Sequence, residues 1–454
     1  MFDLTSASRP LVRPLVLAAA LAMSSGTAWA QGSQSSRFYE DALSRYEQKD
    51  YKGAIVQLKN ALKVDARNIS VQVLLGRSLL ANGDIVAAEV ALNEALALGV
   101  NRAEVVLPLA RAISNQGRQQ ELLDNPRYAV AGLPASVQQP LLLMRAGAAA
   151  DLGDARSALR SIDEARALDA SSAAPWLAEV PVRIRQRQFA EATTAADRAL
   201  QLAPQSAEAL YVRGTVAHVR GDLPAALSFY DRALKISPEH VEALVSRAGV
   251  AMDQNRQADA ERDITQLLKT SPTEPRGSYL RALLSERQGN VNAARSAYND
   301  VTALLDPVPP EFLRHRPQLL MLGGLSHYAL QQFEKAKPYL EMVVRAQPNS
   351  PVSKLLAQLY LRENNVDRAI EALDRYLRVF PGDTQATILL ASAHMSQGRY
   401  NRATQLTQDA LKQRDSADLR TVLGMSLVGG GKVANAVTEL EAAIKKASLE
   451  FRLS

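Results

Sequence analysis

Histidines and carboxylates are the side chains with which this 454-residue sequence could do acid–base or metal chemistry. None of its five histidines lies three or four residues from another, which is the spacing that puts two imidazoles on one face of a helix. His327 and His394 stand where an aromatic ring is expected inside a helical repeat, so we interpret both as packing residues. Carboxylates beside Lys and Arg, as in "DRAL", indicate exposed ion pairs. We therefore predict no catalytic residue, no metal and no cofactor.

The segment "GGGK", Gly429 to Lys432, looks like a phosphate-binding loop. The first glycine of that motif is missing, however, and Val433 stands where Ser or Thr would coordinate magnesium. We interpret the segment as a turn between two helices. The sequence also has no cysteine, which excludes disulfides, thiolate metal ligands, a cysteine nucleophile and a lipid-modified N-terminal cysteine. These observations predict a protein that is not an enzyme.

A repeated phrase indicates which elements carry the remaining side chains. "DRALQLAP", which begins at Asp197, returns as "DRALKISP", which begins at Asp231. The same spacing recurs along the chain, with two longer steps. The residue at the middle of each second helix is, in order, Ala54, Ala88, Leu122, Ala158, Ala192, Ala226, Ala260, Ala294, Ala336, Ala369, Ala403 and Ala436. A second small residue lies twelve positions before each of them, with Val180 as the exception.

This pattern is typical of the tetratricopeptide repeat, two antiparallel helices in about 34 residues. Small residues let the two helices approach closely, a mid-repeat turn ends the first helix, and a proline such as Pro204 or Pro238 ends the second. Units of this kind stack on their neighbours. We predict an all-α fold, a right-handed superhelical solenoid of about twelve repeats. The low aromatic content, 5%, agrees with helices rather than sheets.

The domain organisation begins with a secretory signal. Arg9 and Arg13 precede the apolar run Leu15–Met23, and a small-residue site ends at Ala30, so residues 1–30 are predicted to be a cleaved signal peptide. Residues 31–308 form an N-terminal block of about eight repeats, 309–316 a proline-rich elbow, and 317–454 a C-terminal block of about four. No later segment is apolar for long enough to span a membrane. We expect a periplasmic protein.

The first helices of such repeats line a concave face, where partners bind. The side chains expected there are rich in Tyr, Met and Arg, which recognition surfaces favour. The thinly spread net charge of +6 argues against nucleic acid. The predicted partner-binding residues are Tyr211, His218, Met252, Tyr279, Arg287, Met321, Tyr328, Arg362 and Met395, with Ile388 beside them. An alternative is a direct polysaccharide-binding module that stacks sugars on Tyr211, Tyr279 and Tyr328.

A closer resemblance lies in the opening "FYEDALSRYEQKDYKGAIVQLKNALKVDARN", in "NRAEVVLPLARA", in "ELLDN" and in "AQLYLRENNVDRAIEALDRYL". These segments resemble the PrsT-type tetratricopeptide-repeat proteins of PEP-CTERM/exosortase systems, over nearly the whole mature chain. The resemblance implies a non-catalytic interaction scaffold, associated with exopolysaccharide production or export and with PEP-CTERM protein sorting. Its implied partners are envelope proteins of that machinery. The sequence departs from the family in being shorter and in having no cysteine for a lipid anchor.

The last repeat is predicted to self-associate. In a solenoid each second helix is covered by the following unit. Val437, Leu440, Ala443 and Ile444 lie on the last second helix, and the sequence after them is too short to form that cover. We expect an apolar patch there that favours self-association or partner docking.

Overall fold

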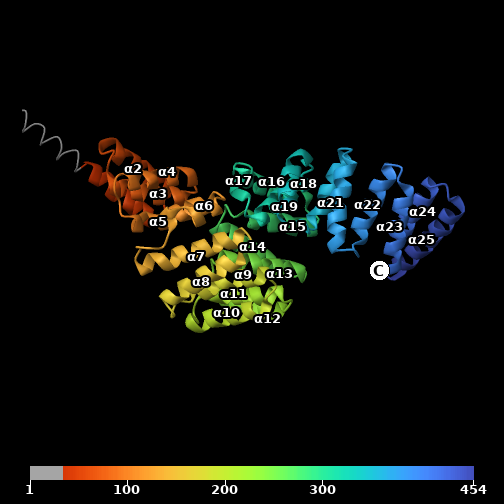
Figure 1. The fold of residues 1–454 in the computed structure, drawn as a ribbon, viewed down its shortest axis with the longest axis horizontal. Helices are drawn as coiled ribbons and strands as arrows, with labels where there is room; N and C mark the ends of the chain where they lie inside the picture. The colour runs from red at the N-terminus through yellow and green to blue at the C-terminus, as the bar shows by residue number, and fades with distance from the viewer. Residues whose placement is uncertain (1–33, 454) are drawn as a thin grey trace, which may run out of the picture. The chain divides into compact units, whose positions relative to one another are not determined.

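The computed structural model describes residues 34–453, and all regular structure in that range is helical (Figure 1). The range contains no strand, which confirms the predicted all-α class. The predicted signal peptide, residues 1–30, lies outside the described residues. The chain divides into two compact units, the first ending at Asp222 and the second beginning at Leu223. Each unit is described by itself.

The first unit is a series of helical hairpins, each made of one first helix and one second helix. Residues 34–47 are helical and form the first helix of the series. The rest follow as α2 (Tyr51–Val64), α3 (Ile69–Asn82), α4 (Ile85–Ala97), α5 (Arg102–Asn115), α6 (Gln119–Asp124), the 3₁₀ turn η1 (Pro126–Tyr128), α7 (Ala135–Asp151), α8 (Ala155–Leu168), α9 (Ala174–Arg185), α10 (Phe189–Leu202) and α11 (Ala207–Val219).

The second unit continues the same alternation. Its elements are α12 (Leu223–Ile236), α13 (Val241–Asp253), α14 (Gln257–Thr270), α15 (Pro275–Arg287), α16 (Val291–Leu305), the short α17 (Pro310–Leu313), α18 (Pro317–Ala329), α19 (Phe333–Ala346), α20 (Val352–Arg362), α21 (Val366–Val379), α22 (Thr384–Ser396), α23 (Tyr400–Gln413), α24 (Ala417–Gly429) and α25 (Val433–Leu453).

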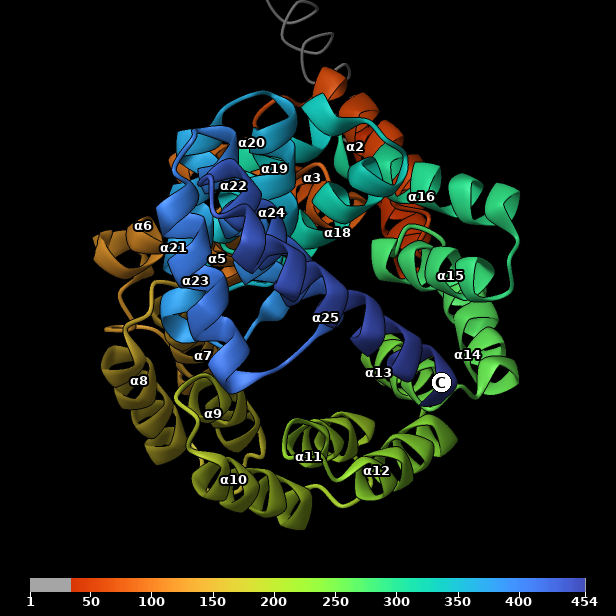
Figure 2. The same cartoon turned by 90° about the vertical axis from the view of Figure 1, so that its right-hand side faces the viewer.

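Successive first helices contact one another within each unit, as α7 does with α9 and α9 with α11. Second helices pack mainly against the first helices on either side of them. Figure 2 shows this arrangement around α8 to α11, where α9 and α11 lie on one side and α8 and α10 on the other. The first helices therefore form one continuous face, as the repeat pattern predicts.

Close approach at the small positions is confirmed by the glycines of the first helices. A methyl group at Gly324 would overlap Cδ2 of Leu340, which is fully buried. At Gly424 an added Cβ would lie 2.6 Å from Cγ of Leu440. In both hairpins the leucine occupies the same position of the facing second helix. The small residue is therefore required by the leucine that covers it.

Gly324→Ala is expected to destabilise the protein although alanine is the better helix former. The gain in helix propensity is about 1 kcal/mol, and overpacking against the buried Leu340 costs about 1–3 kcal/mol. Gly147→Ala in α7 is the control, because nothing lies within 4 Å of a Cβ at that position. Urea denaturation should show Gly147→Ala more stable than the wild type and Gly324→Ala less stable. Equal stabilisation of both variants would contradict the packing argument.

The irregular repeat around Leu122 has a second helix of only six residues, α6. Asn125 caps the 3₁₀ turn that follows, and its side chain accepts a hydrogen bond from the amide of Arg127. Leu122 and Tyr128 are nevertheless buried in the core of this repeat. The predicted extra loop therefore replaces most of a helix and still contributes to the core.

The proline-rich connection before α18 packs against the second unit. Leu313 of α17 is 2% exposed and belongs to the core cluster that contains Leu320 and Leu340. Beside the connection, α18 packs directly on α16. The contacts thus continue across residues 309–316, and the chain divides at Asp222 instead. The grouping into blocks 31–308 and 317–454 stays a prediction.

Candidate functional site

The predicted partner-binding residues all lie on first helices, two in the first unit and the others in the second. Tyr211 and His218 are half-buried on α11, and the Tyr211 ring packs against the cluster that contains Val180 and Val216. Met321, Ile388 and Met395 are also half-buried. Arg287 and Arg362 are exposed. The partner-binding role of the set stays a prediction.

Met252 lies in the core rather than on an open face. Its side chain is 3% exposed and packs with Ile264 and Leu284, between α13, α14 and α15. Its carbonyl oxygen accepts a hydrogen bond from Nη1 of Arg287, which joins two first helices of neighbouring repeats. The residue that the sequence places on the binding face thus serves the packing between repeats.

Tyr279 packs edge-on against Tyr298, with 5.9 Å between the ring centroids. Burial, followed by the charge of Glu286, raises the pKa of Tyr279 to about 12. The ring is therefore part of the layer between α15 and α16. One edge of this ring is occupied by a neighbour, which leaves less of it for stacking on a sugar.

Tyr328 and Arg362 come together around a residue that the sequence analysis did not select, Phe333. The Arg362 guanidinium lies over the Phe333 ring at 4.3 Å from its centroid, a distance typical of a cation–π contact. The Tyr328 ring packs edge-on against Phe333 at 5.4 Å, and its hydroxyl donates a 3.0 Å hydrogen bond to Gln358. Two predicted residues are thus joined by the first residue of a second helix.

These side chains border a cavity of about 560 Å³, which we call the Phe333 cavity. Its lining combines an apolar ring and a leucine with amides and charges of both signs, namely Gln331, Gln332, Phe333, Glu334, Lys335, Leu359, Arg362 and Glu363. Such a mixture suits a protein segment, because an apolar side chain can pack on Phe333 while the amides bind its backbone.

Ion pairs hold the helices on either side of the Phe333 cavity. Nζ of Lys337 in α19 lies 2.6 Å from Oε1 of Glu363, which follows α20, and this hydrogen bond raises the pKa of Lys337. Nζ of Lys335 lies 3.3 Å from Oδ2 of Asp306, the residue that ends α16. The cavity therefore has walls from three neighbouring repeats, fixed by pairs that a ligand need not disturb.

A signal for Phe333 is present in the sequence. An aromatic residue opens the second helix in four repeats, as Tyr51, Phe189, Phe333 and Tyr400. The sequence analysis compared small residues and first helices only, so this aromatic position was missed. Gln358 has no comparable signal, because its role follows from the position of the Tyr328 hydroxyl in space.

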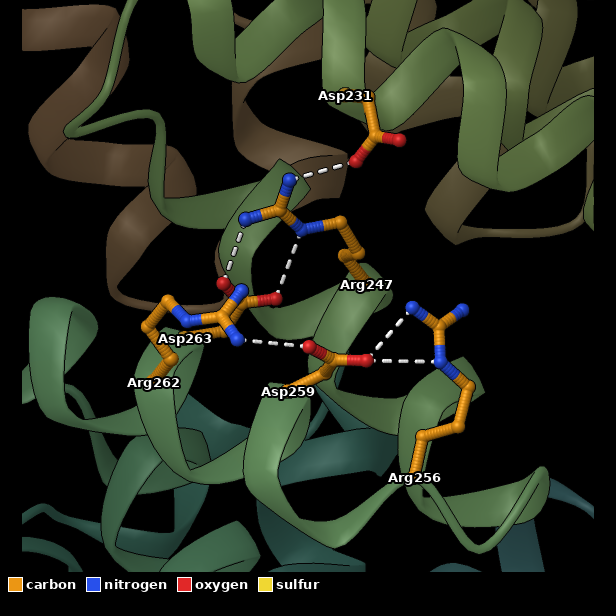
Figure 3. Close-up of polar contacts among 6 residues, drawn as sticks. All are labelled: Asp231, Arg247, Arg256, Asp259, Arg262 and Asp263. Atoms are coloured by element: carbon orange, nitrogen blue, oxygen red, sulfur yellow. Dashed lines mark hydrogen bonds and ion pairs between the residues drawn. The ribbon is translucent and has the colours of Figure 1, made fainter.

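A second cavity, of about 760 Å³, lies among α12, α13 and α14. Its charged residues bind one another (Figure 3). Nε and Nη2 of Arg247 donate hydrogen bonds of 2.8 and 2.6 Å to the two carboxylate oxygens of Asp263, and Nη1 donates one of 2.6 Å to Asp231. The bonds to Asp263 and then to Asp231 raise the pKa of Arg247 above its already high ordinary value. We therefore assign this cluster to structure.

His327 and His394 are buried, as predicted. His327 is fully buried, and its two ring nitrogens lie 2.7 Å from Gln332 Oε1 and 2.8 Å from Asp306 Oδ1. Burial acts to raise the pKa of Asp306, but the hydrogen bond and charge of His327, together with Lys335, outweigh it, so that pKa lies below its usual value. Burial lowers the pKa of His394. Both rings serve packing between helices.

The remaining sequence candidates are located as follows. Gly431 of "GGGK" has φ of 76° in the turn between α24 and α25, so that segment is the predicted turn. Residues 34–453 contain no group of three or more His, Asp or Glu side chains arranged to hold a metal ion. Within the same range no helix is both long and apolar enough to cross a lipid bilayer.

Comparison with known families agrees with this architecture. One model of the tetratricopeptide repeat matches residues 177–241, 246–309 and 354–418, a second matches 45–118, and a third matches 319–350. The chain is a tetratricopeptide-repeat protein, which confirms the predicted fold class. Tetratricopeptide repeats indicate a protein-interaction scaffold, and proteins built from them are typically non-catalytic. No curated protein matches the sequence.

Several solved structures are similar to this chain. The APC/C heterotetramer Cut9–Hcn1 is 13% identical, with 91% of this chain and 94% of that chain covered and a TM-score of 0.47. PilW, a type IV pilus biogenesis factor, is 20% identical, with 48% and 96% covered and a TM-score of 0.36. A tetratricopeptide-repeat protein from Parabacteroides merdae is 18% identical, with 64% and 99% covered and a TM-score of 0.34.

Proposed function

We propose that this protein is a non-catalytic scaffold of the periplasm that binds protein components of an exopolysaccharide or PEP-CTERM/exosortase system. The observation that carries the binding role is the Phe333 cavity, where Tyr328, Phe333 and Arg362 border an open space on the first-helix side of α18 and α20. Aromatic residues and arginine are the types that contribute most binding energy in protein interfaces. An apolar side chain of a partner fits against the Phe333 ring.

The cellular setting of the proposal rests on the sequence. The charged, apolar and small-residue order of residues 1–30 supports export, and the absence of cysteine supports a form without a lipid anchor. The resemblance of "NRAEVVLPLARA" and "ELLDN" to PrsT-type proteins supports the exopolysaccharide or exosortase context. Mass spectrometry of protein from a periplasmic fraction tests the export step, because it should find a mature N-terminus at Gln31.

Polysaccharide is the competing ligand. Two of the three tyrosines proposed as sugar platforms have ring contacts, Tyr279 with Tyr298 and Tyr328 with Phe333. These contacts favour a protein ligand. The experiment must therefore measure protein and glycan in the same sample.

We expect envelope proteins of the export machinery to co-purify with the wild type and to be lost with Phe333→Ala/Arg362→Ala. Removing both partners of the cation–π contact should weaken binding about 30-fold or more, as expected for hot-spot residues. Phe189→Ala is the matched control, because Phe189 opens the second helix of another repeat. Quantitative mass spectrometry and sugar analysis of the eluates give the readout. Retention of glycan instead of protein would refute the scaffold and favour the polysaccharide-binding module.

A further inference from the structure

The last hairpin, α24 and α25, exposes apolar side chains along one stripe. Val433 is 59% exposed, Val437 48% and Ile444 69%, and all three lie along the same side of α25. Val428 near the end of α24 is 51% exposed. Exposed apolar residues grouped in this way differ from single ones scattered over a surface, because a group provides a contact area.

The same repeat positions are covered one repeat earlier. The residues that correspond there to the four exposed side chains are Met395, Tyr400, Thr404 and Leu411. The Tyr400 ring lies against Gly429 of α24, and the Thr404 hydroxyl is 2.9 Å from that of Ser426. Leu411 packs on the cluster of Leu423, Leu427 and Ala436, and Met395 on the cluster that contains Val422. The exposed stripe is therefore the surface that accepts a helix in the preceding repeat.

Two of the residues predicted for this patch lie elsewhere. Ala443 is 4% exposed, and Leu440 packs on Gly424 inside its own hairpin. Helical periodicity explains the difference, since positions 436, 440 and 443 face α24 while 433, 437 and 444 face away from it. A charge at Leu440 would therefore damage the hairpin itself. Variants that test the stripe have to be placed at Val437 and Ile444.

We propose that the stripe of Val428, Val433, Val437 and Ile444 is a homodimer interface, in which α25 of a second copy packs antiparallel on α25. The register requires a helix as the occupant, and α25 itself has the apolar stripe needed to pack on its equivalent. A twofold interface uses one self-complementary patch on both copies, which is the commonest arrangement of homo-oligomers.

The charges beside the stripe agree with an antiparallel partner. Glu441 and Lys445 are both exposed and flank Ile444 on α25. When two copies cross near Ile444 in opposite directions, Glu441 of one copy lies beside Lys445 of the other. A parallel crossing would place like charges side by side, which is unfavourable. Opposed helix dipoles also favour the antiparallel orientation.

Sedimentation of the whole mature chain tests the proposal. The wild type should form a dimer as its concentration rises through the micromolar range, and Ile444→Glu should weaken dimerisation on the order of 100-fold, because a charge is buried without a partner. Val90→Glu is the matched control, since Val90 is 65% exposed on α4 of the first unit. It should dimerise like the wild type. A wild type that stays monomeric at high micromolar concentration would overturn the proposal.

Charge reversal tests the orientation without altering the apolar stripe. Glu441→Lys should weaken the dimer several-fold, and adding Lys445→Glu should restore it, because the pair is then reversed in both copies. Failure of the second change to restore dimerisation would rule out this crossing.

The absence of cysteine allows a second test of orientation. With Ile444→Cys, oxidation should link two copies, whereas with Val433→Cys it should not, because an antiparallel crossing near Ile444 separates the two copies of position 433. Equal linking at both positions would show a parallel or non-specific contact. The thermal unfolding of each variant, measured alongside, confirms that the hairpin stays folded.

Discussion

Arg247→Met is expected to lower the free energy of unfolding of its region by about 3–5 kcal/mol. The reason is Asp263, whose side chain is only 4% exposed and whose two oxygens both bind the Arg247 guanidinium (Figure 3). Without the arginine, a buried carboxylate loses its counter-charge and two hydrogen bonds. Methionine keeps the aliphatic volume, so the loss reports on charge and hydrogen bonding.

Two further variants separate the explanations for that loss. Arg281→Met removes an arginine from the same position of the next repeat, but its partner Asp300 is 49% exposed. It should cost less than about 1 kcal/mol. Arg247→Met/Asp263→Leu removes both buried charges and should recover most of the stability. Urea denaturation gives the magnitude, and hydrogen exchange in α13 and α14 locates it. A large loss in Arg281→Met would show that burial of the carboxylate is not the cause.

Arg247 also shows what the sequence contains and what it lacks. Arg213, Arg247 and Arg281 occupy the same position in three successive repeats, so a position that faces the neighbouring second helices could be predicted. Their partners differ: Arg213 binds Asp197 of the preceding repeat, Arg281 binds Asp300 of its own repeat, and Arg247 binds one of each. Carboxylates occur at many helix positions, and only the packed helices decide which of them an arginine reaches.

The hairpins and their register were predictable because the signal recurs in every repeat. Each copy of the small residue faces a second helix in the same way, as Gly324 and Gly424 do. The candidate site was less predictable, because it depends on departures from the repeat. Met252 has the composition of a binding residue but packs against Leu284 of the next repeat, whereas Phe333 was missed and contacts two selected residues. A repeat position gives the side of a helix, and exposure depends on the neighbours.

The irregular repeat around Leu122 leads to a second large effect. Arg145 of α7 donates hydrogen bonds to the carbonyl oxygens of Leu122 and Leu123, at 2.8 and 3.1 Å, and to that of Tyr128 at 3.3 Å. Carbonyls at the end of a helix have no partner within it, and α6 is so short that this end lies in the middle of the repeat. Arg145 therefore replaces the hydrogen bonds that a full-length second helix would make.

Arg145→Met is expected to destabilise this repeat by about 2–4 kcal/mol, because partly buried carbonyls lose a charged donor. The effect should be local, since each repeat depends chiefly on its neighbours. Limited proteolysis should then cut within residues 125–134 much faster than in the wild type, while the second unit keeps its protection. Arg111→Met, an exposed position on α5, is the control and should be cut like the wild type. If Arg145→Met leaves the cutting rate unchanged, the buried ring of Tyr128 and the packing of Leu122 hold the segment without the arginine.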